Sequence, residues 1–409
     1  MRLNLEKINI VFLSLYLFGF SIEGLTFLKY GGLYGSILIF IIRIAKERDG
    51  IVDNFKDYYF RYKILFNWLF LFILSIIVSM MFAFSDVAET IREFRIQFLN
   101  MTVFIMISLS IKNRKLLLQS FIFSILSGFI YDTIYYLAKY IKHNPKLNLS
   151  IRLDRNFAVY FDFLYPFVLG GIFFLKNRLR YLLIVFLAIA TFEVVLTGAR
   201  GTWVSAIAET VLFGIMISII NKNYLKKVLA VGAISLIVVL IGGSYIYKNS
   251  KLIQFKIHQG LSTSGRTFII KSRFPIIMEH GNILFGIGGP GSYQYITLLN
   301  HYHAPKKYGH YSHGVYRYSA DDPYLLQIFY KEGLFGLVTF LGFTYLFLLY
   351  SYRLLKQNTR YKFILISITA SFIGYFLIRG LVEGRDLRFL ILYFGLFLLA
   401  SQKENNESL

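Results

Sequence analysis

The chain has 409 residues, of which 56% are hydrophobic and 18% aromatic, and long apolar runs pass without a charged residue. This pattern excludes an ordinary soluble domain. There is no cysteine, which excludes disulfides, thiol catalysis and cysteine–metal sites. The formal net charge is +22, but the basic residues lie mostly between the apolar runs. They therefore indicate orientation signals, lipid headgroup contacts or an anionic substrate, and no nucleic-acid partner is expected.

Three of the apolar runs, 64–84, 228–247 and 333–351, are long enough to cross about 30 Å of hydrocarbon as helices. Alternating barrel-type segments are absent, so we predict an all-α polytopic membrane protein with about twelve transmembrane helices. The first run, 8–20, lacks a small-residue cleavage site and is expected to be a retained helix. The predicted spans are 8–28, 30–45, 64–84, 97–111, 116–138, 157–175, 181–197, 202–221, 228–247, 333–351, 363–378 and 389–401.

The loops that follow every second predicted span are strongly basic. The positive-inside rule places these loops and both termini in the cytoplasm, which requires an even number of spans. The basic residues of this set are Arg2, Lys7, Arg43, Lys46, Arg48, Lys56, Arg61, Lys63, Lys112, Arg114, Lys115, Lys176, Arg178, Arg180, Lys222, Lys226, Lys227, Arg353, Lys356, Arg360, Lys362 and Lys403.

The other loops mix arginine with acidic residues, and all seven histidines lie on this predicted outer side. The largest, 248–323, is too long for a simple connector and carries nine Lys/Arg against three Asp/Glu, with many tyrosines. Aromatic faces suit sugar rings and arginine suits phosphate, although an interfacial aromatic belt accounts for some of these residues. We divide the chain into helices 1–9 (1–247), a periplasmic loop domain (248–332), and helices 10–12 with a cytoplasmic tail (333–409).

Arg200 lies in a very short turn, 197–201, between two predicted spans on the outer side. An arginine near the membrane is costly and usually pairs with an anion, and its small neighbours leave room for a ligand. A snorkelling arginine at the interface is the simpler alternative. Glu193 and Glu209, in the flanking helices, are either its structural partners or groups that face the bundle interior.

A second candidate anion-binding residue, Arg266, begins the predicted short helix 266–273 after Ser264 and Gly265. The start of this helix and the guanidinium could receive an anion together. An amphipathic interfacial helix is the alternative, and both can hold. The glycine-rich run 284–291 indicates tight turns rather than a nucleotide site.

Candidate acid–base residues precede the tenth predicted span. Asp322 or His313 could deprotonate a sugar hydroxyl, although a wet polar loop is the simpler interpretation of either residue alone. His301 and His303 are two residues apart, which is a poor spacing for a metal on a helix, so no metal site is predicted.

These features follow one another in a distinctive order. A small-residue turn with arginine (197–203) closes two spans, a Gly-Arg helix (265–266) and a Phe-Gly-Ile-Gly turn (285–288) follow in a large outer loop, and a polar residue leads into the run 324–336. This order resembles the O-antigen ligase and O-antigen polymerase superfamily, most clearly over about residues 190–345. The resemblance depends on the four motifs occurring in this order with this predicted topology.

The resemblance implies a GT-C-like architecture at the bacterial inner membrane, with the active site facing the periplasm. It implies a metal-independent, inverting glycosyltransferase without a cofactor, which acts in O-antigen or other surface-polysaccharide biosynthesis. The donor would be a glycan on undecaprenyl diphosphate. The acceptor would be a sugar hydroxyl, of lipid A–core in a ligase or of another lipid-linked repeat in a polymerase. By position, Arg200 and Arg266 would hold the diphosphate.

Ligases of this superfamily place a His-Asn pair about where this chain has Asp322 and Pro323, and that histidine is their proposed base. Asp322 or His313 would act here instead, and an acidic residue at this point looks more like many polymerases. The sequence therefore leaves both activities, ligase and polymerase, open. A lipid-linked oligosaccharide flippase is the alternative from another class, but it would be expected to show two similar halves.

Overall fold

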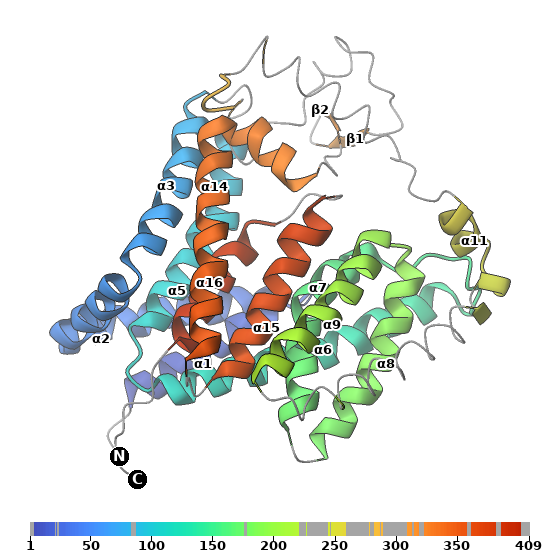
Figure 1. Ribbon diagram of the computed structural model, residues 1–409, viewed down its shortest axis with the longest axis horizontal. Coiled ribbons are helices and arrows are strands. Elements are labelled where there is room, and N and C mark those ends of the chain that lie inside the picture. The colour runs from blue at the N-terminus through green and yellow to red at the C-terminus, as the bar shows by residue number, and fades with distance from the viewer. Residues whose placement is uncertain are drawn as a thin grey trace.

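The computed structural model describes residues 4–20, 22, 24–82, 87–175, 178–220, 226, 244–245, 247–258, 278, 282–286, 288, 309–312, 315–318, 323–357, 361–381 and 386–401. This part of the chain is a helical bundle with one β-hairpin (Figure 1). The α-helices are α1 (Leu5–Phe20), α2 (Thr26–Arg61), α3 (Lys63–Met80), α4 (Val87–Phe94), α5 (Asn100–Leu109), α6 (Arg114–His143), α7 (Arg155–Phe174), α8 (Leu179–Thr197), α9 (Arg200–Ile220), α11 (Lys251–His258), α14 (Tyr324–Lys356), α15 (Lys362–Phe372) and α16 (Arg388–Ala400).

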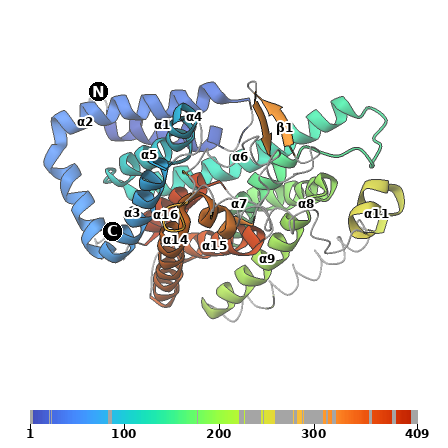
Figure 2. The same ribbon diagram turned by 90° about the horizontal axis from the view of Figure 1, so that it is seen from above.

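Three further helical turns interrupt or extend these helices. They are the π-helices η1 (Arg95–Leu99) and η3 (Ile373–Ile378) and the 3₁₀ turn η4 (Arg379–Leu381). The hairpin consists of β1 (Gly309–Ser312) and β2 (Val315–Tyr318), paired antiparallel. In Figure 1 the hairpin lies at the same end of the molecule as the start of α14, and in Figure 2 α2 and α11 lie at opposite edges.

Eight of the described helical segments are long and apolar enough to cross a membrane, as a polytopic membrane protein requires. They are Thr26–Arg61, Lys63–Met80, Arg114–His143, Arg155–Phe174, Leu179–Thr197, Arg200–Ile219, Tyr324–Lys356 and Lys362–Leu381. The shorter apolar helix α16 corresponds to the last predicted span. Most of the predicted ninth span, 228–247, lies outside the described residues.

The segment 46–61 is helical, although its charges suggested a basic loop. The predicted span 30–45 lies inside α2, which continues to Arg61 past one non-helical residue, Glu47 (φ −134°, ψ 29°). Arg43, one of the basic orientation residues, is fully buried and donates to Ser110 Oγ (3.1 Å) and to the Ser110 carbonyl oxygen (3.0 Å). These acceptors make burial of the guanidinium possible, and hydropathy cannot foresee them because they lie 67 residues away.

Helix α9 presents opposite chemistry on its two faces. Its large apolar side chains Val204, Ile207, Val211, Ile215 and Ile219 are exposed and recur at helical spacing. Its polar side chains Thr202, Ser205 and Glu209 are fully buried in the bundle. An apolar exterior around a polar interior is the arrangement that hydrocarbon surroundings favour.

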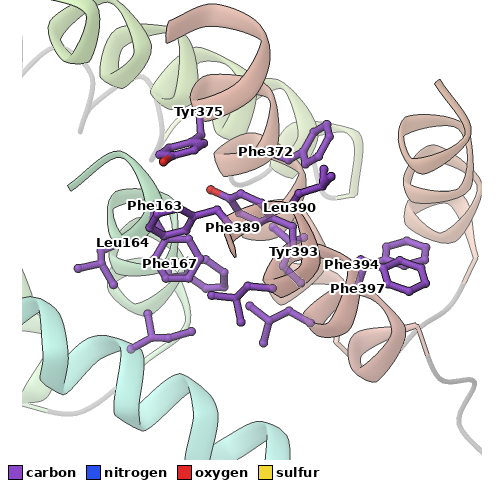
Figure 3. Packing of buried hydrophobic residues seen from close by; sticks show 14 of the residues in the cluster. Phe163, Leu164, Phe167, Phe372, Tyr375, Phe389, Leu390, Tyr393, Phe394 and Phe397 are labelled. Carbon is purple, nitrogen blue, oxygen red and sulfur yellow. The ribbon is translucent and has the colours of Figure 1, made fainter. Parts of the chain in front are cut away.

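The centre of the bundle is an aromatic contact between α7, the α15–η3 segment and α16 (Figure 3). Phe163 of α7 lies 5.0 Å from Phe389 and 5.5 Å from Tyr393 of α16, measured between ring centroids. The Tyr393 hydroxyl shares a 2.6 Å hydrogen bond with Ser371, whose Oγ also lies 3.1 Å from the carbonyl oxygen of Phe163. Because lipid is as apolar as these rings, close packing and such polar contacts hold the helices together.

Candidate functional site

Arg200 is the first residue of α9, and a hydrogen-bonded turn places it there. Gly198 caps α8 in the left-handed region (φ 64°), where a residue with a Cβ is strained. The Ala199 N–H donates to Thr197 Oγ1 (3.1 Å), and Arg152 Nε donates to the Thr197 carbonyl oxygen (2.7 Å). The turn therefore has a defined shape and is tied to the segment that precedes α7. Arg200 itself is partly exposed.

The position of Arg200 suits an anion. The first N–H groups of a helix and the positive end of its dipole favour negative charge, and an arginine at that point adds a fork of donors. Glu193 and Glu209, the expected partners or interior groups, are both fully buried, and their carboxylate oxygens accept no hydrogen bond from the described residues. Both glutamates are therefore groups of the bundle interior.

A buried polar network lies directly behind this turn. On α7, the carbonyl oxygen of Ala158 accepts from Thr202 Oγ1 of α9 (3.4 Å) and from Arg379 Nη1 of η4 (2.7 Å). The Asp162 carboxylate accepts from Ser205 Oγ of α9 (2.9 Å) and pairs with Arg379 Nη1 (2.5 Å). Arg379 is 3% exposed and Asp162 is fully buried, so this is an ion pair in the bundle interior.

Arg379 belongs to one of the predicted outer loops that mix arginine with acidic residues, and the sequence alone does not single out Asp162. The signal for Asp162 is present, since it is the only acidic residue within the apolar segment 157–175. An ionisable residue inside a span is costly and normally has a partner or a function. The partner, more than 200 residues away, follows only from the tertiary structure.

The Phe-Gly-Ile-Gly turn docks onto α14. Gly286 (φ 75°) and Gly333 (φ 69°) are both left-handed, and Gly333 kinks α14 nine residues after its start. The backbone N–H groups of Leu334 and Phe335 donate to the carbonyl oxygens of Ile283 (2.8 Å) and Leu284 (3.0 Å). Within the described part of the predicted run 284–291, the turn at 282–286 is tight, and it is tied to the helix that follows Asp322.

Alanine at Gly333 should lower stability by about 1–3 kcal/mol, because a Cβ at this φ is strained and would overlap the backbone of Leu284. Thermal unfolding in detergent micelles would measure the change. The matched control is Gly31→Ala in α2, where nothing lies within 4 Å of the added carbon. That control should be neutral or gain up to about 1 kcal/mol of helix propensity. Equal melting temperatures for the two variants would contradict the strain.

The other three candidate residues, Arg266, His313 and Asp322, lie outside the described residues. The strand pairing brings the backbone of His310 opposite Arg317, and Asp322 directly precedes Pro323, which caps α14. Among the described residues, no group of three or more His, Asp or Glu side chains is arranged to hold a metal ion.

Asp154 caps the start of α7, the helix that carries Ala158 and Asp162. Its carboxylate accepts from the Asn156 N–H (3.0 Å) and pairs with Lys139 Nζ of α6 (2.9 Å). Burial alone would raise the pKa of this carboxyl, but the hydrogen bonds from Asn156 and Lys139 and the charge of Lys139 outweigh it and lower the pKa.

A lowered pKa in the folded state means that ionised Asp154 stabilises the fold above its unfolded pKa of about 3.9, and that this contribution is lost as pH falls through the folded pKa. We expect the melting temperature of the wild type to exceed that of Asp154→Asn at neutral pH. The difference should shrink progressively below about pH 5. A difference that stays constant down to pH 3 would show that the charge of Asp154 contributes nothing.

The fold and this site define a helical, polytopic membrane protein with a cationic helix start above a buried ion-pair network. Residues 183–341 match the model of the O-antigen ligase family; the matched segment begins in α8, includes Arg200 and the 282–288 turn, and ends in α14. The resemblance to the O-antigen ligase and polymerase superfamily is thereby confirmed, and a domain of this family indicates a glycosyltransferase-type enzyme. A comparison with curated proteins gave no match.

Proposed function

We propose that this protein transfers a glycan from undecaprenyl diphosphate to a sugar hydroxyl at the periplasmic face of the bacterial inner membrane. The observation that carries the proposal is the place of Arg200. It is the first residue of an apolar helix, on a glycine-capped turn, within the segment that matches the O-antigen ligase family. A diphosphate on a lipid would reach a helix end at the membrane surface, and in the proposed orientation Arg200 stands at such an end.

In the proposed reaction the acceptor hydroxyl oxygen attacks the anomeric carbon from the face opposite the diphosphate. The bond from that carbon to the phosphate oxygen breaks, so the configuration inverts and undecaprenyl diphosphate leaves with the bonding electrons. Asp322 or His313 takes the hydroxyl proton. Arg200 and Arg266 stabilise the charge that develops on the diphosphate, and neither the leaving group nor the base requires a metal in this scheme.

The proposal includes the membrane arrangement that the charges predict. The chain would cross the membrane twelve times in a GT-C-like bundle, with the loop domain between helices 9 and 10 in the periplasm and both termini in the cytoplasm. The asymmetry of basic residues between alternate loops supports this orientation. Cysteine accessibility labelling, for which the native chain provides a cysteine-free background, would test it at Lys226 and Arg200.

A purified assay with lipid-linked repeats, with and without lipid A–core, tests the activity. Glycan transferred only when lipid A–core is present identifies a ligase, and longer lipid-linked chains without it identify a polymerase. Lipid-linked repeats that cross a vesicle membrane without chemical change would identify a flippase and refute the enzyme.

In cells, loss of a polymerase should leave single repeats attached to the acceptor. Loss of a ligase should leave none attached, while lipid-linked polymer accumulates. The pattern of surface glycan in a deletion strain therefore separates the two members of the superfamily that the sequence leaves open.

A further inference from the structure

The first two turns of α9 are held by the same two groups that hold Arg379. The carbonyl oxygen of Ala158 binds Thr202 and Arg379, and the carboxylate of Asp162 binds Ser205 and Arg379. Helix α7 thus supplies the acceptors, while α9 and η4 supply the donors. The three elements meet behind the turn that carries Arg200.

These contacts determine where α9 begins. Thr202 and Ser205 are two and five residues after Arg200, which corresponds to about 3 Å and 7.5 Å along the helix axis. The other side of the turn is tied to the same part of the chain, since the Leu153 N–H donates to the carbonyl oxygen of Leu196 (3.2 Å). Any shift of α7 against α9 therefore moves Arg200.

Arg379 can hold this junction because of the shape of its side chain. Its Nη1 alone donates to both the Ala158 carbonyl oxygen and the Asp162 carboxylate, and the rigid, planar guanidinium holds this nitrogen in place. The flexible lysine side chain is shorter and does not hold its single nitrogen at the same point. Its charge is balanced by Asp162 at 2.5 Å, and it is 3% exposed. It is thus suited to fix geometry rather than to contact a ligand.

We propose that Arg379 is a positioning residue that aligns Arg200 with the diphosphate of the donor by locking the start of α9 to Ala158 and Asp162 of α7. The inference rests on the function proposed above. It assigns a role to the C-terminal part of the chain, because Arg379 lies beyond the segment 183–341 that matches the family. A misplacement of about 1 Å at such a site can cost about 100-fold in rate.

The test is a double-mutant cycle in which undecaprenyl diphosphate itself is the probe. Its Kd is measured by titration of the full-length protein in detergent micelles. Arg379→Lys should raise the Kd about 10-fold when Arg200 is present and less than about 2-fold in an Arg200→Ala background, since a residue that acts through Arg200 has nothing left to align. A change that only loosened the fold would weaken binding equally in both backgrounds.

The matched control is Arg388→Lys. Arg388 belongs to the same C-terminal part of the chain and pairs with Asp386 through its Nε (2.6 Å), and its guanidinium lies 5.4 Å from the Phe20 ring. The Arg388→Lys variant should leave the Kd for undecaprenyl diphosphate unchanged. Ser205→Ala is the second variant, because it removes one bond between α9 and Asp162 while the Arg379–Asp162 pair stays. It should raise the Kd by a smaller factor than Arg379→Lys.

Equal effects of Arg379→Lys in both backgrounds would overturn the positioning role. A normal Kd for folded Arg379→Lys, when Arg200→Ala weakens binding, would also overturn it but leave the proposed function standing. If Arg200→Ala does not weaken binding, the diphosphate site is wrong and the positioning role fails with it. If Arg379→Lys does not fold, an unchanged Kd for folded Ser205→Ala rejects the proposal.

Discussion

Alanine at Arg200 should reduce glycan transfer by about 100- to 1,000-fold while the protein stays folded and inserted. The reason is that the guanidinium stands at the start of α9, where the charge of the departing diphosphate would develop. The side chain is partly exposed and lies at a helix end, where a substitution generally costs less stability than in a fully buried core. The rate is measured with purified protein and lipid-linked repeats, and the surface glycan of cells that carry the variant provides a second measurement.

The control for this change is Arg92→Ala. Arg92 lies in the mixed-charge loop after the predicted span 64–84, on the predicted outer side, and its side chain is 48% exposed and pairs with the adjacent Glu93 (3.3 Å). Its removal should change the rate by less than about 2-fold, as expected for an exposed ion pair. Equal losses in the two variants would show that overall positive charge, and not the place of Arg200, supports transfer. Normal transfer by Arg200→Ala would refute the site.

Alanine at Asp162 should destabilise the fold by about 3–5 kcal/mol, because it leaves the Arg379 guanidinium buried without its carboxylate. Ser205 loses one of its two acceptors in the same step and keeps the carbonyl oxygen of Thr202 (3.1 Å). We expect a lower melting temperature in micelles and a smaller fraction of monodisperse protein after expression. Because α9 is released from α7, the folded remainder should also transfer glycan more slowly.

Two further variants separate the ion pair from general effects. The double change Asp162→Asn with Arg379→Gln removes both charges and keeps groups that can hydrogen-bond, so it should recover part of the lost stability. Asp57→Ala breaks a pair with Arg61, in which the Asp57 side chain is 45% and the Arg61 side chain 41% exposed, and a longer contact with Arg114 (3.9 Å). Because the Asp57 carboxylate is exposed, its loss should cost no more than about 1 kcal/mol. If Asp162→Ala costs as little as Asp57→Ala, the buried pair does not hold the bundle.

Much of the fold follows from composition and periodicity. A long apolar run with few charges has few alternatives to a spanning helix, which is why α3, α7, α8 and α15 coincide with predicted spans. The same reasoning misjudged the segment 46–61, where many charges suggested a loop but the chain continues as α2. Helix formation depends on local backbone hydrogen bonds and tolerates charged side chains, so charge alone does not end a helix.

The candidate site, like the fold, is predictable from the sequence only in part. Arg200 was evident from the sequence because an arginine between small residues at a span boundary is unusual, and its turn forms through neighbouring groups such as Gly198 and Thr197. The docking of the glycine turn onto α14 is not evident from the sequence, because Gly286 and Gly333 are far apart along the chain. The two segments meet through backbone hydrogen bonds at the kink of α14.

The sequence by itself thus determined that this is a helical membrane protein with an arginine at a helix start, in a segment that matches the O-antigen ligase family. These properties are local, because hydropathy, charge and short motifs are read over a few turns of chain. Only the tertiary structure decided that Asp162 and Arg379 pair in the interior and that Ala158 joins them to α9. Such contacts depend on which helices pack together, and in lipid that is decided by side-chain fit and scarce polar partners rather than by hydrophobicity.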